Sequence, residues 1–103
     1  MFVLLAQGPA PCAAPNVPPA IVRGYQPDVP AAAAQRRISG TVDVVIRLDE
    51  SSRLVGIAIA ASPSALLNAA ALAAARGSVF RTEVRNCEPV AADYLFSVEF
   101  TSQ

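Results

Sequence analysis

Two segments of the chain alternate apolar and polar residues with a period of two. In residues 41–48 the apolar series is Val42, Val44, Ile46 and Leu48. In residues 92–100 it is Tyr94, Phe96, Val98 and Phe100. Successive residues of a strand point to opposite faces of a sheet. The pattern therefore predicts two β-strands, each with one buried face.

A third strand is predicted over residues 54–60, with Val55, Ile57 and Ile59 on one face. The polar residues 49–53 separate it from the strand before. Two strands joined by a short polar turn are typical of an antiparallel hairpin.

Two helices are predicted, and the first is a short one in which residues 31–34 continue the helix. Asp28 is its predicted cap, and Pro30 is tolerated in the first turn because its missing N–H would have no helical partner there. Arg36 and Arg37 are expected in the last turn, where cations complement the helix dipole.

The second predicted helix covers residues 69–76, which are rich in alanine. Asn68 is its predicted N-cap and Gly77 its end. Leu67 and Leu72 occupy the two positions of a hydrophobic staple.

These elements predict a two-layer α+β domain, with two helices packed on one face of a three-stranded antiparallel sheet. Residues 20–103 would form this domain. It would begin with a short edge strand at residues 20–22 and include a polar loop at residues 81–89.

The N-terminal part differs in composition. Seven of the nine prolines fall in the first 30 residues, so residues 1–19 are predicted to form an extended, proline-rich lead-in. The apolar residues 2–6, followed by a small-x-small pattern at 6–8, favour the end of a signal peptide or anchor. The alternative is a frayed start.

The two cysteines, Cys12 and Cys87, fit one disulfide if the protein is exported. Such a bridge would contribute about 4 kcal/mol through loop closure. The alternative is a pair of free thiols in a cytosolic protein.

Composition excludes several classes of function. The net charge is zero, and the basic residues are eight arginines with no lysine or histidine. A neutral chain without a basic cluster favours neither nucleic-acid binding nor attachment to an anionic membrane surface.

The chain also lacks the parts of most enzymes. Without histidine and lysine, the commonest general base and the amine nucleophiles are missing. Asp49 and Glu50 are adjacent carboxylates, but neighbours in a turn point apart and favour a solvated turn over an acid–base pair. We predict no catalytic residues, no metal site and no cofactor.

The order of these elements resembles the C-terminal domain family of TonB-type energy transducers, over residues 19–100. The matching positions are Tyr25 with Pro27, residues 40–44, Leu48 with Asp49, Ala61 with Ser62, residues 67–72, Phe80, and residues 94–100. Three positions depart from the family pattern. Gln26 interrupts the Tyr-Pro pair, Ser52-Arg53 stands where the family usually has a glycine in the hairpin turn, and Thr82 replaces a proline usual after Phe80.

The resemblance implies a function through the last strand, which in the family lies at a sheet edge and pairs with an extended peptide of an outer-membrane transporter. The partner-binding residues it implies here are Tyr94, Leu95, Phe96, Ser97, Val98, Glu99 and Phe100. Phe96, Val98 and Phe100 are expected to serve as core, so that Leu95, Ser97 and Glu99 frame the groove. Glu99 is alternatively an edge-protecting charge.

The resemblance also implies contacts to the transporter from the region of the first helix, through Arg23, Tyr25 and Arg37. The alternative is a solvated helix end. The expected protein is thus a periplasmic or secreted peptide-binding domain and not an enzyme. The competing hypothesis is a secreted structural domain that uses the same edge to associate with itself, for example as a homodimer.

Overall fold

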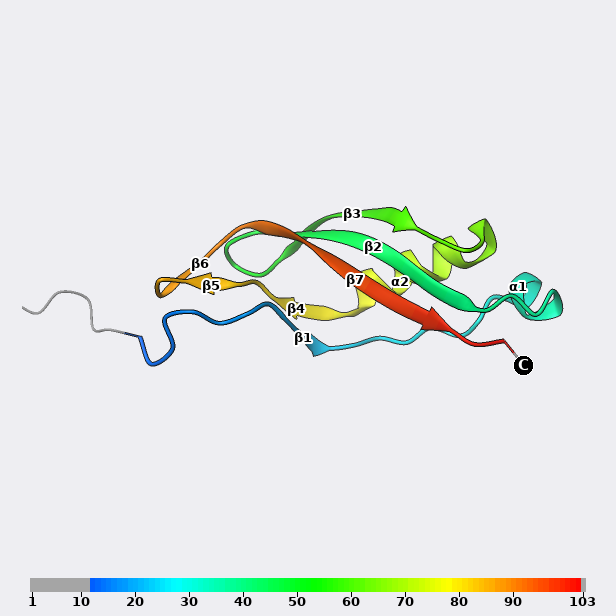
Figure 1. Cartoon of the computed structure of the whole chain (residues 1–103), viewed down its shortest axis with the longest axis horizontal. Coiled ribbons are helices and arrows are strands. Elements are labelled where there is room, and N and C mark those ends of the chain that lie inside the picture. The colour runs from blue at the N-terminus through cyan, green and yellow to red at the C-terminus, as the bar shows by residue number, and fades with distance from the viewer. Residues whose placement is uncertain (1–11, 103) are drawn as a thin grey trace, which may run out of the picture.

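The computed structural model describes residues 12–102, so the predicted leader remnant at residues 2–8 lies outside the described part. The main sheet has three antiparallel strands in the order β3–β2–β7. Helix α2 lies across one face of this sheet, and α1 lies beyond one end (Figure 1). The bounds are α1 Ala31–Gln35, β2 Gly40–Leu48, β3 Leu54–Ala61, α2 Asn68–Gly77 and β7 Ala92–Phe100.

The predicted α+β class and three-stranded antiparallel sheet are thus present, but of the two helices only α2 covers the sheet face, whereas α1 packs against the 3₁₀ turn before α2. Further strands accompany the main sheet. Two small antiparallel sheets are formed by the pairs β1–β4 and β5–β6. Their bounds are β1 Ala20–Arg23, β4 Val79–Arg81, β5 Val84–Arg85 and β6 Glu88–Pro89.

The alternating residues of β2 and β7 build the core. Both apolar series face α2, because the register pairs Val42 with Val98 and Val44 with Phe96. The buried apolar residues are Ala33, Val42, Val44, Ile46, Leu48, Leu67, Ala71, Ala74, Ala75, Phe80, Phe96, Val98 and Phe100. The alanines of α2 let the helix approach the sheet closely.

Strand β3 corrects the predicted face assignment. The pairing with β2 shifts by one residue between Arg47 and Leu48, so that Val55 is an extra residue in β3. A bulge of this kind reverses the alternation locally. Val55 is therefore 58% exposed, while Leu54 and Ile57 pack against the core.

The start of α2 also differs from the prediction. A 3₁₀ turn, Ala65–Leu67, precedes the helix, and its N-cap is Ser64, whose hydroxyl accepts a hydrogen bond from the Leu66 N–H at 3.2 Å. Asn68 is therefore the first residue of the helix and not its cap. The helix includes Gly77, and Ser78 is its C-cap.

The caps of α1 were predicted wrongly as well. Its N-cap is Pro30, without a side-chain hydrogen bond, so Asp28 does not cap it. At the other end, Arg36 is the C-cap and Arg37 adopts a left-handed conformation with φ 53°. Both arginines therefore follow the helix and do not lie in its last turn.

The segment predicted as a polar loop at residues 81–89 contains the β5–β6 hairpin. Arg85 pairs with Glu88, which leaves a two-residue turn at Asn86 and Cys87. Both turn residues have positive φ, 51° and 68°, the conformation of a type I′ turn. Cys87 thus takes the place that glycine usually has in this turn. The sequence therefore lacked the Asn-Gly pair that would have predicted a hairpin here.

Candidate functional site

Strand β7 forms one edge of the main sheet. In the part of the chain that the structure describes, β2 is its only strand neighbour. The pairing runs without a shift from Gly40–Phe100 to Leu48–Ala92. The position expected for the last strand is therefore observed, whereas its binding of a partner is not tested by this observation.

One hydrogen bond shows which backbone groups of β7 face outward. The Glu99 carbonyl accepts a hydrogen bond from the side-chain amide of Gln26, which is not on β2. In an antiparallel pair, alternate residues direct their N–H and C=O to the same side. Asp93, Leu95 and Ser97 therefore also present their backbone groups to the open edge.

The side chains of β7 divide between the two faces. Phe96, Val98 and Phe100 are buried, so they belong to the core as expected, and Tyr94 is half-buried against it. On the other face, Ser97 and Glu99 are exposed and Leu95 is 61% exposed. The outward backbone groups and the exposed side chains thus belong to the same residues.

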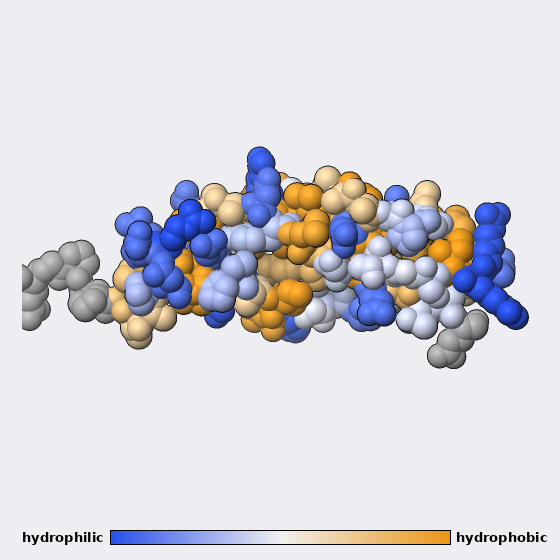
Figure 2. Space-filling model, in the orientation of Figure 1, coloured by the Kyte–Doolittle hydropathy of each residue, from blue (hydrophilic) through white to orange (hydrophobic). Residues whose placement is uncertain are grey.

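A groove of about 280 Å³ runs beside this edge. Its lining comes from β1, β2, β4 and β7, which are distant in sequence. The lining residues are Pro19, Ala20, Ile21, Ile46, Leu48, Phe80, Arg81, Tyr94, Leu95, Phe96 and Ser97. Apolar side chains gather at the middle of this face, and polar surface lies toward both ends (Figure 2).

Two aromatic residues of β7, Phe96 and Tyr94, contact the wall of the groove that β4 and the residues after it form. The rings of Phe80 and Phe96 meet edge to face, with centroids 5.1 Å apart. The Tyr94 hydroxyl accepts the Glu83 N–H at 2.9 Å and lies 2.9 Å from the Thr82 hydroxyl. Sequence reasoning did not assign Phe80, Thr82 or Ile21 to the site. The replacement of the family's usual proline by Thr82 was the one sequence feature that pointed to this region.

Polar contacts order the outer face of the sheet. Arg47 on β2 holds Asp93 on β7 through two hydrogen bonds, of 2.7 and 3.1 Å. These bonds and the charge of Arg47 lower the pKa of Asp93. The Ser97 hydroxyl donates to Asp43 at 2.7 Å. The side chains of Asp93 and Ser97 are thus bound to β2. Between them, Leu95 is the exposed apolar residue that β7 contributes to this face.

The three other predicted contact residues do not line the groove. Arg23 is exposed at the end of β1. The Tyr25 N–H donates to the Ser78 hydroxyl at 2.9 Å, and its ring covers Gly77, where a Cβ would lie 2.9 Å from the ring. Arg37 directly follows Arg36, the C-cap of α1, and α1 itself lies beyond one end of the sheet (Figure 1). The Tyr25 ring thus packs on Gly77 while remaining 51% exposed, and partner contacts of these three residues stay a prediction.

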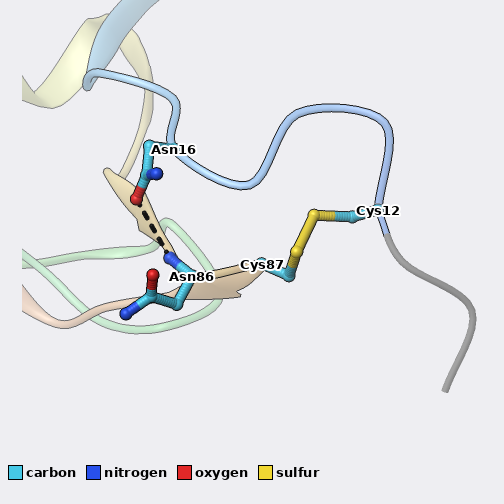
Figure 3. The surroundings of a disulfide bond; sticks show 4 residues. All are labelled: Cys12, Asn16, Asn86 and Cys87. Atoms are coloured by element: carbon cyan, nitrogen blue, oxygen red, sulfur yellow. Dashed lines mark hydrogen bonds between the residues drawn. A yellow bond between two sulfur atoms is a disulfide. The ribbon is translucent and has the colours of Figure 1, made fainter. Parts of the chain in front are cut away.

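The disulfide between Cys12 and Cys87 is present, with a Cα–Cα distance of 5.7 Å (Figure 3). Backbone bonds reinforce it, because Val17 and Val84 exchange two hydrogen bonds of 2.9 Å. The Asn86 N–H donates to the Asn16 side chain at 3.1 Å. The lead-in is therefore bonded to the β5–β6 hairpin at residues 12–17, just before residues 19–21 line the groove.

These features define a small α+β interaction domain with an open sheet edge beside an apolar groove. A family model described as the C-terminal domain of the TonB protein of Gram-negative bacteria matches residues 25–102. The chain belongs to this family, whose members are periplasmic domains that interact with outer-membrane proteins. No curated protein matches the chain. Within residues 12–102, none of the helices has the length and apolar character needed to cross a membrane.

Proposed function

We propose that this domain binds an extended segment of an outer-membrane transporter, or of another envelope protein, by adding it as a strand to β7. The observation that carries the proposal is the open edge of β7, which turns alternate backbone groups toward an apolar groove. Main-chain hydrogen bonds would provide affinity, and the groove would select side chains.

Binding, and not catalysis, is the proposed mode of action. The chain contains neither histidine nor lysine. On the outer face of β7, the Asp93 carboxylate is already engaged by Arg47. These observations favour a protein-interaction role for the same surface.

The test is an NMR titration with a capped peptide that alternates threonine and valine, both strong strand formers. We expect amide shifts to concentrate at Asp93, Leu95 and Ser97. Shifts confined to other parts of the domain would count against strand addition.

A proline variant tests the role of the backbone itself. Ser97→Pro removes an outward N–H, while the bonds to β2 come from the alternate residues. We expect it to weaken peptide binding by at least about threefold. Ser97→Ala is the matched control, since it loses the hydroxyl but keeps the N–H, and it should bind like the wild type. Melting curves would confirm that both variants fold.

A second copy of the chain is the alternative occupant of this edge. The exposure of Leu95 beside unpaired backbone groups favours this alternative. Sedimentation would show a concentration-dependent dimer that Ser97→Pro abolishes, and peptide binding would then compete with dimerisation.

A further inference from the structure

The segment between β1 and α1 passes the end of the open edge and closes part of it. The Gln26 side-chain amide donates to the Glu99 carbonyl at 3.1 Å, across a separation of 73 positions. This carbonyl is one of the acceptors that a visiting strand would use. The chain therefore already occupies one position of its own binding edge.

The surface beside β7 is divided at the same place. The groove described above borders residues 94–97 of β7. A separate, shallow hollow lies farther along the strand, and it is lined by Gln26, Pro27, Asp28, Val29, Glu99, Phe100 and Thr101. Gln26 thus stands where the apolar groove has ended and a different surface begins.

We propose that Gln26 sets the end of the binding register, so that a visiting strand pairs with residues 93–97 and stops before Glu99. This inference rests on the proposed function and specifies its partner. The partner is a short extended peptide that places an apolar side chain against Phe80 and Phe96.

The reason is an exchange of hydrogen bonds. A longer peptide that pairs with Glu99 must first displace the Gln26 amide, so the bond that it forms to the Glu99 carbonyl only replaces one that already exists. The one new bond, to the Glu99 N–H, is offset by the entropy lost in ordering the added residues, so the net gain in the wild type is close to zero. Without the amide, the same contact becomes a gain worth roughly a two- to tenfold change in affinity.

The experiment compares two capped threonine–valine peptides by calorimetry. The short peptide covers residues 93–97, and the long one extends it by two residues at each end. Wild-type protein should bind both with the same affinity, within about twofold. Gln26→Ala should bind the long peptide roughly two- to tenfold more tightly and the short peptide unchanged.

Two further variants isolate the amide. Gln26→Met keeps the length of the side chain but cannot donate, and it should show the same preference for the long peptide. Gln35→Ala makes the same change at an exposed position at the end of α1, and it should behave like the wild type.

The outcomes separate this inference from the proposed function. If both Gln26 variants bind the two peptides in the wild-type ratio, the register role of Gln26 is wrong while strand addition stands. If wild-type protein already binds the long peptide severalfold more tightly, the register role is wrong as well. If neither peptide binds any of the proteins, the proposed function fails and this inference fails with it.

Discussion

The hydroxyl groups of Thr82 and Tyr94 share a hydrogen bond of 2.9 Å. Thr82 is fully buried, and its hydroxyl also bonds to the Val90 carbonyl at 2.5 Å. A carbonyl can only accept, so Thr82 is the donor to Val90 and Tyr94 is the donor to Thr82. Tyr94 in turn accepts the Glu83 N–H. This chain of bonds holds the β4–β5 connection against the edge strand.

We therefore expect Tyr94→Phe to destabilise the fold. The variant leaves the Glu83 N–H and one lone pair of Thr82 without their partner, at a cost of about 1–3 kcal/mol. The melting temperature should fall by about 4–8 °C per kcal/mol, as measured by calorimetry.

Tyr25→Phe is the matched control for this change. Its hydroxyl makes no hydrogen bond in the part of the chain that the structure describes, so the melting temperature should stay within about 1 °C of the wild type. Equal melting temperatures for Tyr94→Phe and the wild type would contradict the role assigned to the network.

The disulfide should contribute strongly to stability. It joins positions 75 residues apart, and closing a loop of this size stabilises a domain by about 4 kcal/mol. We expect a reducing agent to lower the melting temperature by several degrees.

The double variant Cys12→Ser with Cys87→Ser provides the control. It should melt like the reduced wild type, and a reducing agent should leave it unchanged. A wild-type melting curve that does not respond to reduction would show that the backbone bonds between Val17 and Val84 suffice to hold the lead-in.

Arg37 lies in a backbone conformation that favours glycine. It follows the C-cap of α1 with φ 53°. Its N–H bonds to the Ala34 carbonyl and the Ile38 N–H bonds to the Ala33 carbonyl, the pair of bonds that defines a Schellman motif. Arg37→Gly should therefore raise the free energy of unfolding by about 0.5–1 kcal/mol.

Arg36→Gly is the control for this prediction. Arg36 has φ −95°, which an L-residue adopts without strain, so glycine there should give no gain and a small loss. Denaturant unfolding of both variants would measure the difference. A loss of stability in Arg37→Gly would mean that the arginine side chain makes a larger contribution than its backbone costs.

The strands that rest on strict alternation could be predicted from the sequence. In β7, Phe96 and Val98 lie on the buried face of the strand, and the alternation of apolar and polar residues predicts this directly. The bulge that exposes Val55 could not be read in the same way, because it depends on how β3 pairs with β2 and not on β3 alone.

The groove was beyond sequence reasoning for a related reason. It joins Ile21 of β1 to Phe80 of β4, and only the three-dimensional pairing of these strands brings them together. The departure at Gln26 was visible in the sequence. Its consequence was not, because the Glu99 carbonyl that it binds lies 73 positions away.

The ion pair between Arg47 and Asp93 gives stability a defined dependence on pH. The hydrogen bonds and charge of Arg47 lower the pKa of Asp93 in the folded state. The unfolded state then binds a proton more readily, so the contribution of the pair is complete above the unfolded pKa, about 4. It is lost as the pH falls through the lower, folded pKa.

Asp93→Asn isolates this contribution, because the amide has no charge to titrate. The difference in melting temperature between wild type and variant should be largest near neutral pH and should shrink below about pH 4. High salt should reduce the difference as well, since both side chains are exposed to solvent. A difference that stays constant from neutral pH to about pH 2 would show that Asp93 acts through packing and not through its charge.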